Sequence, residues 1–306
     1  MSHKEFFMSS HSFIHRSLFC QSVIRGELEA IQIQHPKCSA TLLLQGAQLL
    51  EFIPSSTNRN LLWLSPDAEY KQGKSIRGGI PVCWPWFGAV EKNPAQVSDA
   101  VIKPIAHGFA RNLNWQLTEL KESCHQVEIV LALSSNETTR QYWRYEFELQ
   151  ARFIFAEQLT IDLITTNKDA KAFHISQALH TYLPTQDIKQ TQITGFSGLK
   201  YIDALHNWSE KTQTGAIQFK AETDRLYQAA ENILAITPNN QTLLESKNST
   251  SAVVWNPWVK KSQGLSQFVD DAYQRMFCIE TANVLWDIKA INPDASQTLT
   301  LKLSDA

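Results

Sequence analysis

The sequence predicts an all-β protein, built as one large antiparallel β-sandwich with few short helices. Several segments alternate apolar and polar residues with the period of two that a half-buried strand requires. No regular succession of strands and long amphipathic helices appears, so a parallel sheet is not expected. A length of 306 residues and a hydrophobic content of 43% suffice for a large core. Because no repeat or linker interrupts the chain, we expect a single domain over residues 1–306.

The clearest strand pattern covers residues 144–155, which read RYEFELQARFIF. Every second residue from Tyr145 to Phe155 is apolar, and the residues between them are mostly charged or polar. The short segment 156–158 follows, and the alternation resumes at Leu159 with LTIDLIT. This spacing predicts an antiparallel hairpin.

Other alternating or apolar segments predict the remaining strands. Amphipathic helical patterns are few and short, and we expect one such helix near residues 223–229. The expected strands begin at Val127 (VEIVLALS), Ala172 (AFHISQALHTYL), Ala252 (AVVWN), Met276 (MFCIET) and Gln297 (QTLTLKL).

Charge and cysteine content restrict the partners and the compartment. With 28 basic and 30 acidic side chains the formal net charge is -2, so no overall field favours nucleic acid or an anionic membrane. The five cysteines are scattered and form no C-x-x-C pair, which argues against a disulfide framework and a zinc knuckle. No segment has the pattern of a signal peptide or the roughly 18 to 20 apolar residues of a membrane span. We expect a cytoplasmic monomer with no nucleic-acid or membrane partner.

Residues 75–88 read SIRGGIPVCWPWFG, a combination typical of neither a core strand nor a linker. Arg77 stands beside Gly78 and Gly79, whose backbone can approach a ligand closely or adopt a positive φ. A guanidinium beside glycine amides can bind an anion, because both groups donate hydrogen bonds. A tight turn with a surface arginine and buried aromatic residues explains the same stretch.

A second candidate anion site lies in AHGFARNLNW, which begins at Ala106. His107 and Arg111 are four residues apart, with Gly108 between them. Taken alone, the segment fits a loop-to-strand junction with a solvated arginine equally well. Two arginines in glycine-containing, aromatic-rich loops nevertheless favour a phosphate site, because a phosphate accepts bidentate hydrogen bonds from two such forks.

Three titratable residues are candidates for chemistry. His180 lies within the apolar strand SQALHTYLP and could be a general acid, since the unperturbed pKa of histidine is about 6.5, or a structural histidine of the core. Glu280 interrupts the apolar run of RMFCIETAN, where a carboxylate is costly unless it is paired, hydrogen-bonded or functional. Asp203 in LKYIDAL could be an ordinary turn residue.

Several common catalytic motifs are absent from the sequence. It contains no G-x-S-x-G, H-E-x-x-H, Walker loop or G-x-G-x-x-G, which excludes most serine hydrolase, metalloprotease and nucleotide-binding classes. Trp255 and Trp258 offer aromatic faces suited to a sugar ring, although such residues also build β-protein cores.

Six motifs occur in a fixed order over most of the chain: SIRGGIPVCWPWFG, AHGFARN, QALHTYL, KYIDAL, VVWNPW and RMFCIET. Together they resemble the hexose-6-phosphate mutarotases, also called glucose-6-phosphate 1-epimerases, of the aldose 1-epimerase superfamily. The resemblance extends over about residues 20 to 303. It implies a galactose-mutarotase-like β-sandwich of the supersandwich type and an isomerase of carbohydrate metabolism that interconverts the anomers of a hexose 6-phosphate.

The resemblance also implies roles for particular residues. Glu280 would be the base at the anomeric hydroxyl and His180 the acid at the ring oxygen, and this chemistry needs no metal or redox cofactor. Some family members carry a substrate-contacting glutamine where this chain has Ala106, so that contact is not expected here. The implied substrate-binding residues are Arg77 and Arg111 at the phosphate, His107 at the sugar and Asp203 at a sugar hydroxyl.

Three other functions compete with this interpretation. An aldose 1-epimerase for unphosphorylated sugars would keep His180 and Glu280 but would not need two anion-binding arginines. A catalytically silent carbohydrate-binding or sensor protein would not need an isolated acid in an apolar strand. A two-carboxylate glycosidase is least supported, because Glu280 has no equally marked acidic partner in the sequence.

Overall fold

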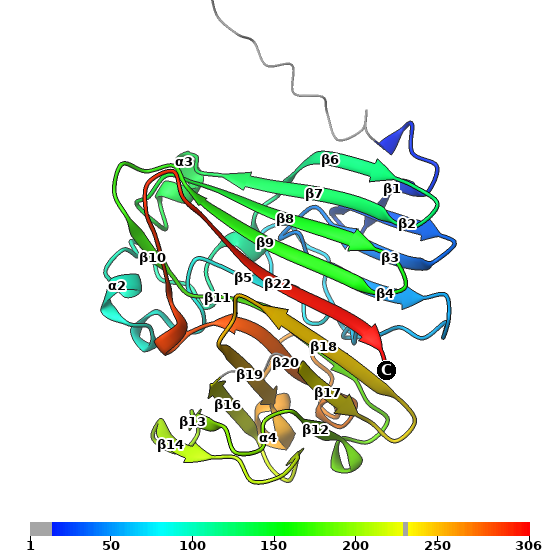
Figure 1. Ribbon diagram of the computed structural model, residues 1–306, viewed down its shortest axis with the longest axis vertical. Coiled ribbons are helices and arrows are strands. Elements are labelled where there is room, and N and C mark those ends of the chain that lie inside the picture. Colours follow the sequence, from blue (N-terminus) through cyan, green and yellow to red (C-terminus); the bar gives the residue numbers. More distant parts are fainter. Residues whose placement is uncertain (1–13, 229–231) are drawn as a thin grey trace, which may run out of the picture.

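Antiparallel β-sheets make up most of the computed structural model, which describes residues 14–228 and 232–306 (Figure 1). The all-β prediction is therefore confirmed, and the helices in the described residues are short. No helix in these ranges is long and apolar enough to cross a membrane. The first thirteen residues of the expected domain lie outside the described residues.

The largest sheet has nine strands, and it contains the hairpin predicted from residues 144 onward. Along both strands of that hairpin, alternate side chains are buried, as the sequence pattern requires. In order across the sheet the strands are β15 (Ile217–Gln218), β12 (Gln192–Thr194), β17 (Asn232–Ile236), β18 (Gln241–Lys247), β22 (Ser296–Asp305), β9 (Leu159–Asn167), β8 (Phe147–Phe155), β7 (Val127–Ser134) and β6 (Gln116–Glu122).

A second sheet has seven strands and contains three of the six candidate site residues, His180, Glu280 and Asp203. One of its faces contributes Leu179, Val254 and Ile279 to the main hydrophobic core, which it shares with the nine-stranded sheet. In order its strands are β14 (Ser209–Thr212), β13 (Lys200–Asp203), β16 (Thr223–Gln228), β19 (Ser251–Asn256), β20 (Met276–Asn283), β11 (Gln177–Pro184) and β5 (Val82–Cys83).

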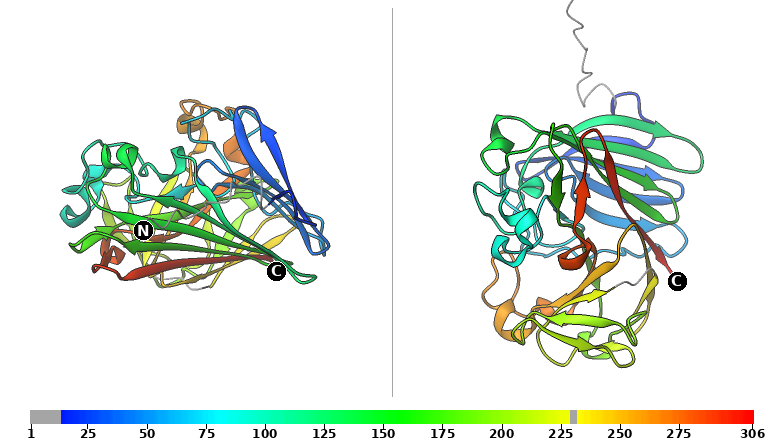
Figure 2. Two further views of the ribbon diagram at one scale, coloured as in Figure 1. Left: turned by 90° about the horizontal axis from the view of Figure 1, so that it is seen from above. Right: turned by 60° about the vertical axis from the view of Figure 1, so that its left-hand side comes forward.

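A four-stranded sheet of β1 (Cys20–Arg25), β2 (Leu28–His35), β3 (Cys38–Leu43) and β4 (Leu49–Pro54), shown in blue, lies against β6 to β9 in the views of Figures 1 and 2. Its apolar side chains belong to the same core. The small elements are the strand pair β10 (Phe173–Ile175) and β21 (Lys289–Ile291), the helices α2 (Ala95–Ser98), α3 (Glu137–Arg140) and α4 (Trp258–Ser262), and the 3₁₀ turns η1 (Val90–Lys92), η2 (Ala110–Asn112), η3 (Ile188–Gln190), η4 (Ala272–Gln274) and η5 (Leu285–Asp287).

Two local predictions were wrong. The helix expected near residues 223–229 is strand β16 over Thr223–Gln228, because β13 and β19 pair with it on either side, and Ala229 lies outside the described residues. The strand expected from Ala172 is divided at Ser176 into β10 and β11. The Ser176 hydroxyl accepts a hydrogen bond from the Phe87 amide (2.9 Å), which ties the break to the loop after β5.

A close backbone contact joins the two arginine-bearing segments. Gly108 forms an isolated parallel bridge with Trp84, and the amide of Phe109 donates to the Trp84 carbonyl (3.1 Å). Gly108 has φ +70, and a Cβ at this position would lie 1.9 Å from the Trp84 carbonyl oxygen. Only glycine fits this approach.

We predict that Gly108→Ala lowers the free energy of unfolding by at least ~2 kcal/mol, because a strained φ and an overpacked contact add. Gly73→Ala is the matched control, since Gly73 has φ +71 but no atom within 4 Å of the added Cβ. Its cost should stay near 1 kcal/mol. Denaturant unfolding measures both, and equal losses would contradict the close-approach argument.

Candidate active site

Strand pairing places the candidate catalytic residues in one row across the seven-stranded sheet. His180 on β11 pairs with Glu280 on β20, Glu280 pairs with Val253 on β19, and Val253 pairs with Leu226 on β16. Neighbouring strands present directly paired residues on the same face, so these side chains project together. This face is opposite to the one that carries Leu179 and Ile279 into the main core.

A second row lies two residues away along each strand and therefore on the same face. It joins Tyr182, Cys278, Trp255 and Asp224 through direct pairs between β11, β20, β19 and β16. Three of these side chains, those of Tyr182, Trp255 and Asp224, line the same cavity as His180 and Glu280. The sheet thus supplies the floor of a site.

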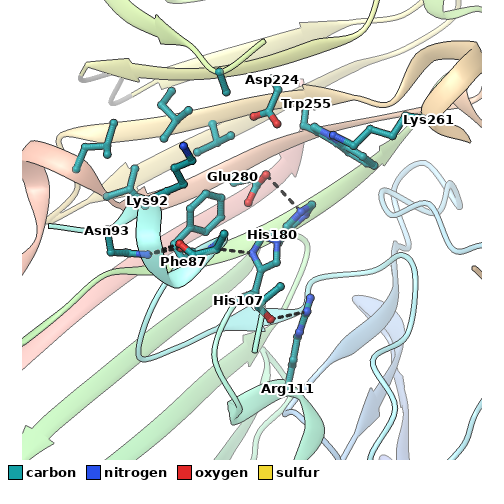
Figure 3. A pocket seen from close by; sticks show the side chains of 18 of the residues that line it. Phe87, Lys92, Asn93, His107, Arg111, His180, Asp224, Trp255, Lys261 and Glu280 are labelled. Atoms are coloured by element: carbon teal, nitrogen blue, oxygen red, sulfur yellow. Dashed lines mark hydrogen bonds and ion pairs between the residues drawn. The ribbon is translucent and has the colours of Figure 1, made fainter. Parts of the chain in front are cut away.

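Loops from the rest of the chain complete a cavity of ≈380 Å³ over this floor (Figure 3). A volume of this size falls in the range of small-molecule sites. Five of the six predicted site residues line it: Arg77, His107, Arg111, His180 and Glu280.

His180 and Glu280 form a close buried pair. The distance from His180 Nε2 to Glu280 Oε1 is 3.4 Å, and the two residues are 8% and 1% exposed. His180 Nδ1 and Glu280 Oε2 are buried and have no hydrogen-bond partner among the described residues. Such atoms are costly in a folded protein and common at functional sites.

Burial shifts both groups of this pair away from their charged forms. Desolvation raises the pKa of the Glu280 carboxyl well above its usual range, and the charge of Asp224 raises it further. Desolvation lowers the pKa of His180 to about 3, with further lowering from the charges of Arg111 and Arg77. Both shifts favour the neutral forms, a carboxylic acid at Glu280 and an unprotonated imidazole at His180.

Aromatic rings fix the orientation of His180. The Tyr182 ring stacks on the imidazole with a centroid distance of 4.8 Å and an interplanar angle of 14°. The rings of His107 and Trp255 meet it edge-on at 5.7 Å and 6.1 Å. These contacts leave the imidazole little freedom to rotate out of the cavity.

His107 is held as a neutral hydrogen-bond donor. Its backbone has φ 63, and its Nδ1 accepts a hydrogen bond from the Gly88 amide at 3.3 Å. Burial and the nearby charge of Arg111 lower its pKa well below the usual value. Because Nδ1 accepts, the ring proton resides on Nε2, which can donate to a ligand.

Arg77 and Arg111 line the cavity without an acidic partner among the described residues. Arg111 Nη2 donates to the Ala106 carbonyl (2.8 Å), and Arg77 Nε donates to the Ser266 carbonyl (3.4 Å). Arg111 Nε is buried and has no partner there. Backbone carbonyls orient both guanidiniums but do not neutralise them, so each arginine keeps its positive charge in the cavity.

Comparison with known proteins identifies the family of this fold and site. The sequence profile described as "Aldose 1-epimerase" matches residues 29–304. The chain belongs to the aldose 1-epimerase family.

Proteins with similar sequences or structures match this chain over most of its length. A protein of Escherichia coli (strain K12) named "Putative glucose-6-phosphate 1-epimerase" is 34% identical over 260 residues, covering 84% of this chain and 83% of its own. A crystal structure named as a putative mutarotase, from Salmonella typhimurium, has a TM-score of 0.86, 29% identity and 95% coverage of both chains. A galactose mutarotase-like protein from Lactobacillus casei, with a TM-score of 0.71, 14% identity, and coverage of 90% of this chain and 100% of its own, shares the fold. The galactose-mutarotase-like sandwich inferred from the resemblance is confirmed.

The structure does not bring Asp203, the sixth predicted site residue, into the epimerase cavity lining. Its carboxylate accepts from Lys211 Nζ at 2.7 Å and lies 2.9 Å from His206 Nδ1. Both contacts involve Oδ2, and Oδ1 accepts from the Leu205 amide at 3.2 Å, so the sugar contact at Asp203 stays a prediction.

Asp224 occupies the cavity instead. Desolvation raises the pKa of its carboxyl to about 6, partly offset by the charge of Lys261. The sequence analysis missed this residue because it placed residues 223–229 on a helix. On strand β16, the pairing of Asp224 with Trp255 sends both side chains to the cavity face.

The two candidate tryptophans separate in the structure. Trp255 lines the cavity, whereas Trp258 packs on Tyr273 at 5.3 Å and is not among the lining residues. Ala106 also lines the cavity, where a longer side chain would reach further toward a ligand. Among the described residues, no three His, Cys, Asp or Glu side chains are grouped so that they could hold a metal ion.

We predict opposite pH effects on stability for the two aspartates. The folded protein holds the Asp224 proton more tightly than the unfolded chain, so stability falls as pH rises from about 4 through about 6. Asp224→Asn removes this loss, and its unfolding free energy relative to wild type should rise by about 2 kcal/mol between pH 4 and pH 7, with allowance for partial exposure.

Asp203→Asn is the matched control with the reverse sign. Hydrogen bonds from Lys211 and His206 outweigh burial and lower the pKa of Asp203, so wild type gains stability as the pH rises through the titration of this carboxyl. This gain is nearly complete at the ordinary aspartate pKa of about 4, so Asp203→Asn should lose stability relative to wild type as the pH rises toward 4 and should change little between pH 4 and pH 7. Denaturant unfolding at several pH values tests both, and parallel curves for the two variants would contradict the assignment.

Proposed function

We propose that this epimerase interconverts the α and β anomers of a hexose 6-phosphate, with glucose 6-phosphate as the substrate. The observation that carries the proposal is the combination, in one cavity, of a close acid-base pair with two arginines. The printed names of the Escherichia coli and Salmonella typhimurium relatives, both "Putative glucose-6-phosphate 1-epimerase", support the choice of substrate.

The His180 and Glu280 pair matches the chemistry of anomer exchange. The ring oxygen and the anomeric hydroxyl are bonded to the same carbon, and the reaction moves one proton from the hydroxyl and one proton to the ring oxygen. Glu280 accepts the hydroxyl proton while His180 donates to the ring oxygen, so the bond between carbon and ring oxygen breaks and the open aldehyde forms. Rotation of the aldehyde and the reverse transfers close the ring on its other face.

The arginines and the remaining cavity residues hold the rest of the substrate. Arg77 and Arg111 bind the phosphate by charge-assisted hydrogen bonds. His107 donates from Nε2 to a sugar oxygen, and Asp224 accepts from a sugar hydroxyl. The face of Trp255 packs against the ring.

We further propose that residues 1–306 form one domain and that the protein acts as a monomer in the cytoplasm. One core cluster supports the domain proposal, because it contains side chains from the four-, seven- and nine-stranded sheets.

We predict that His180→Ala and Glu280→Gln each lower the catalysed exchange of glucose 6-phosphate at least ~10²-fold, since general acid-base groups contribute that much. The double variant should be little worse than either single variant, because the two groups act as one unit. His174→Ala is the control, since His174 lies on β10 and is not among the cavity-lining residues. Magnetisation-exchange NMR measures the rates, and near-native exchange in either single variant would exclude the acid-base assignment.

We predict that Arg77→Ala and Arg111→Ala each reduce the ratio of kcat/KM for glucose 6-phosphate to that for glucose by about 10- to 150-fold. This range corresponds to about 1.5–3 kcal/mol for hydrogen bonds to a charged group. Arg275→Ala is the control, because Arg275 pairs with Asp271 on the surface. If both cavity variants keep the wild-type ratio, the arginines do not bind the phosphate.

A further inference from the structure

The charges of the cavity are arranged along a line that passes through the acid-base pair. Figure 3 shows Arg111, His107, His180, Glu280 and Asp224 in this order from the bottom of the view upward. The contacts between successive rings and carboxyl groups agree: the rings of His107 and His180 are 5.7 Å apart, and His180 lies 3.4 Å from Glu280. The Arg111 guanidinium therefore lies at one end and the Asp224 carboxyl at the other, and Arg77 also lines the cavity.

This arrangement favours the proton on Glu280, whereas the proposed reaction needs it on His180. A proton moved from Glu280 to His180 creates a positive charge on the side of Arg111 and a negative charge on the side of Asp224. Both changes bring like charges together and are unfavourable. Beyond the effect of burial, Arg111 and Arg77 both lower the pKa of His180. At Glu280, Asp224 raises the pKa and Arg111 alone of the two arginines lowers it, so the arginines act more on His180 than on Glu280.

The reaction requires the opposite distribution. The proposed acid must be an imidazolium and the proposed base a carboxylate, but the pair without substrate consists of a neutral imidazole and a carboxylic acid. The two forms contain the same number of protons. The difference between a silent and a competent site is therefore the position of one proton across a 3.4 Å contact.

We propose that the phosphate of the substrate, bound by Arg77 and Arg111, drives the transfer of this proton from Glu280 to His180 and so activates the catalytic pair. In the step, the O–H bond of the Glu280 carboxyl breaks and an N–H bond forms at His180 Nε2. No proton is exchanged with solvent. This inference rests on the proposed function and assigns the phosphate a role in kcat as well as in binding.

The charge balance supports the mechanism. A phosphate monoester carries roughly −1.5 to −2 charges at pH 7, which matches the two guanidiniums. When it is bound, it offsets the part of the lowered His180 pKa that comes from Arg111 and Arg77, while the larger part, from burial, remains. The other titratable or charged groups around His180 are Glu280 and Cys278 on β20, Cys83 on β5, His107 before η2, Tyr182 on β11, Asp224 on β16, Lys92 in η1 and Lys261 in α4. Of these, Lys261 is paired with Glu222 at 3.1 Å.

Two kinds of substitution at the two arginines distinguish the effect of their charge from that of their hydrogen-bonding geometry, with unphosphorylated glucose as the substrate. Arg77→Gln and Arg111→Gln remove a positive charge, whereas Arg77→Lys and Arg111→Lys keep it and lose the bidentate fork. If the charges suppress the pair, each Gln variant should raise kcat for glucose at least ~5-fold above wild type. Each Lys variant should stay at or below the wild-type value.

A measurement on the wild-type enzyme keeps the test independent of any variant that fails to fold. The reacting complex needs the one proton that His180 and Glu280 share, so the alkaline limb of the pH profile of kcat reports the pKa at which the pair loses it. We expect this limb to lie about one pH unit or more higher with glucose 6-phosphate than with glucose. The second ionisation of the phosphate itself, near pH 6, affects the acidic limb and leaves the alkaline limb interpretable.

The outcomes distinguish this inference from the proposed function. If wild type does not exchange glucose 6-phosphate, the proposed function is wrong. If it does, but folded Gln variants show no rise in kcat for glucose or the alkaline limbs coincide for the two substrates, the activation by phosphate is wrong and the proposed function stands. Where wild type has no measurable activity on glucose, a gain of activity in the Gln variants supports the inference, and its absence overturns it.

Discussion

The in-register pairing of β16, β19, β20 and β11 is the constraint on which the site depends. Direct pairs carry one row from Leu226 through Val253 and Glu280 to His180, and the row two residues away contains Asp224, Trp255 and Tyr182. A slip of one residue in any of these pairs would send a catalytic side chain to the opposite, core-facing side. The relative positions of these floor side chains therefore depend on the hydrogen bonds between the paired strands.

The same strand pairing buries two titratable side chains, which costs free energy because their charged forms lose contact with water. Glu280 is 1% exposed and His180 is 8% exposed, and neither has a complete set of hydrogen bonds within the described residues. Of the five buried side-chain atoms without a partner in those residues, three belong to the cavity residues His180, Glu280 and Arg111. Rigid aromatic contacts from Tyr182 and His107 hold the imidazole in this costly position. The site is thus ordered by its surroundings before any ligand arrives, which is the condition for fast proton transfer.

The sequence predicted strands correctly where the alternation of apolar residues agrees with the strand pairing of the structure. The alternation across residues 144–167 fixed the faces of β8 and β9, and an acid within an apolar strand identified Glu280 as a candidate. The prediction failed at β16, because six residues carry too little periodicity to exclude a helix, and pairing with β13 and β19 decided their conformation. That single error hid Asp224 and left Asp203 as the visible acid. The contact of Lys211 with Asp203 depends on the pairing of β13 with β14, which no local pattern reveals.

The electrostatic field inside the cavity links two groups of residues that the sequence identified, the arginines and the acid-base pair. Arginines beside glycines were chosen as anion ligands, and His180 with Glu280 as proton carriers, on separate grounds. Arg111, His180 and Glu280 lie along one line (Figure 3), and a charge bound at Arg77 and Arg111 changes the energy of a proton on His180. In a cavity lined by Leu226, Val253 and Trp255 water screens this coupling little. A ligand without an anionic group then occupies the same floor but leaves the proton on Glu280, so discrimination between substrates arises in the chemical step as well as in binding.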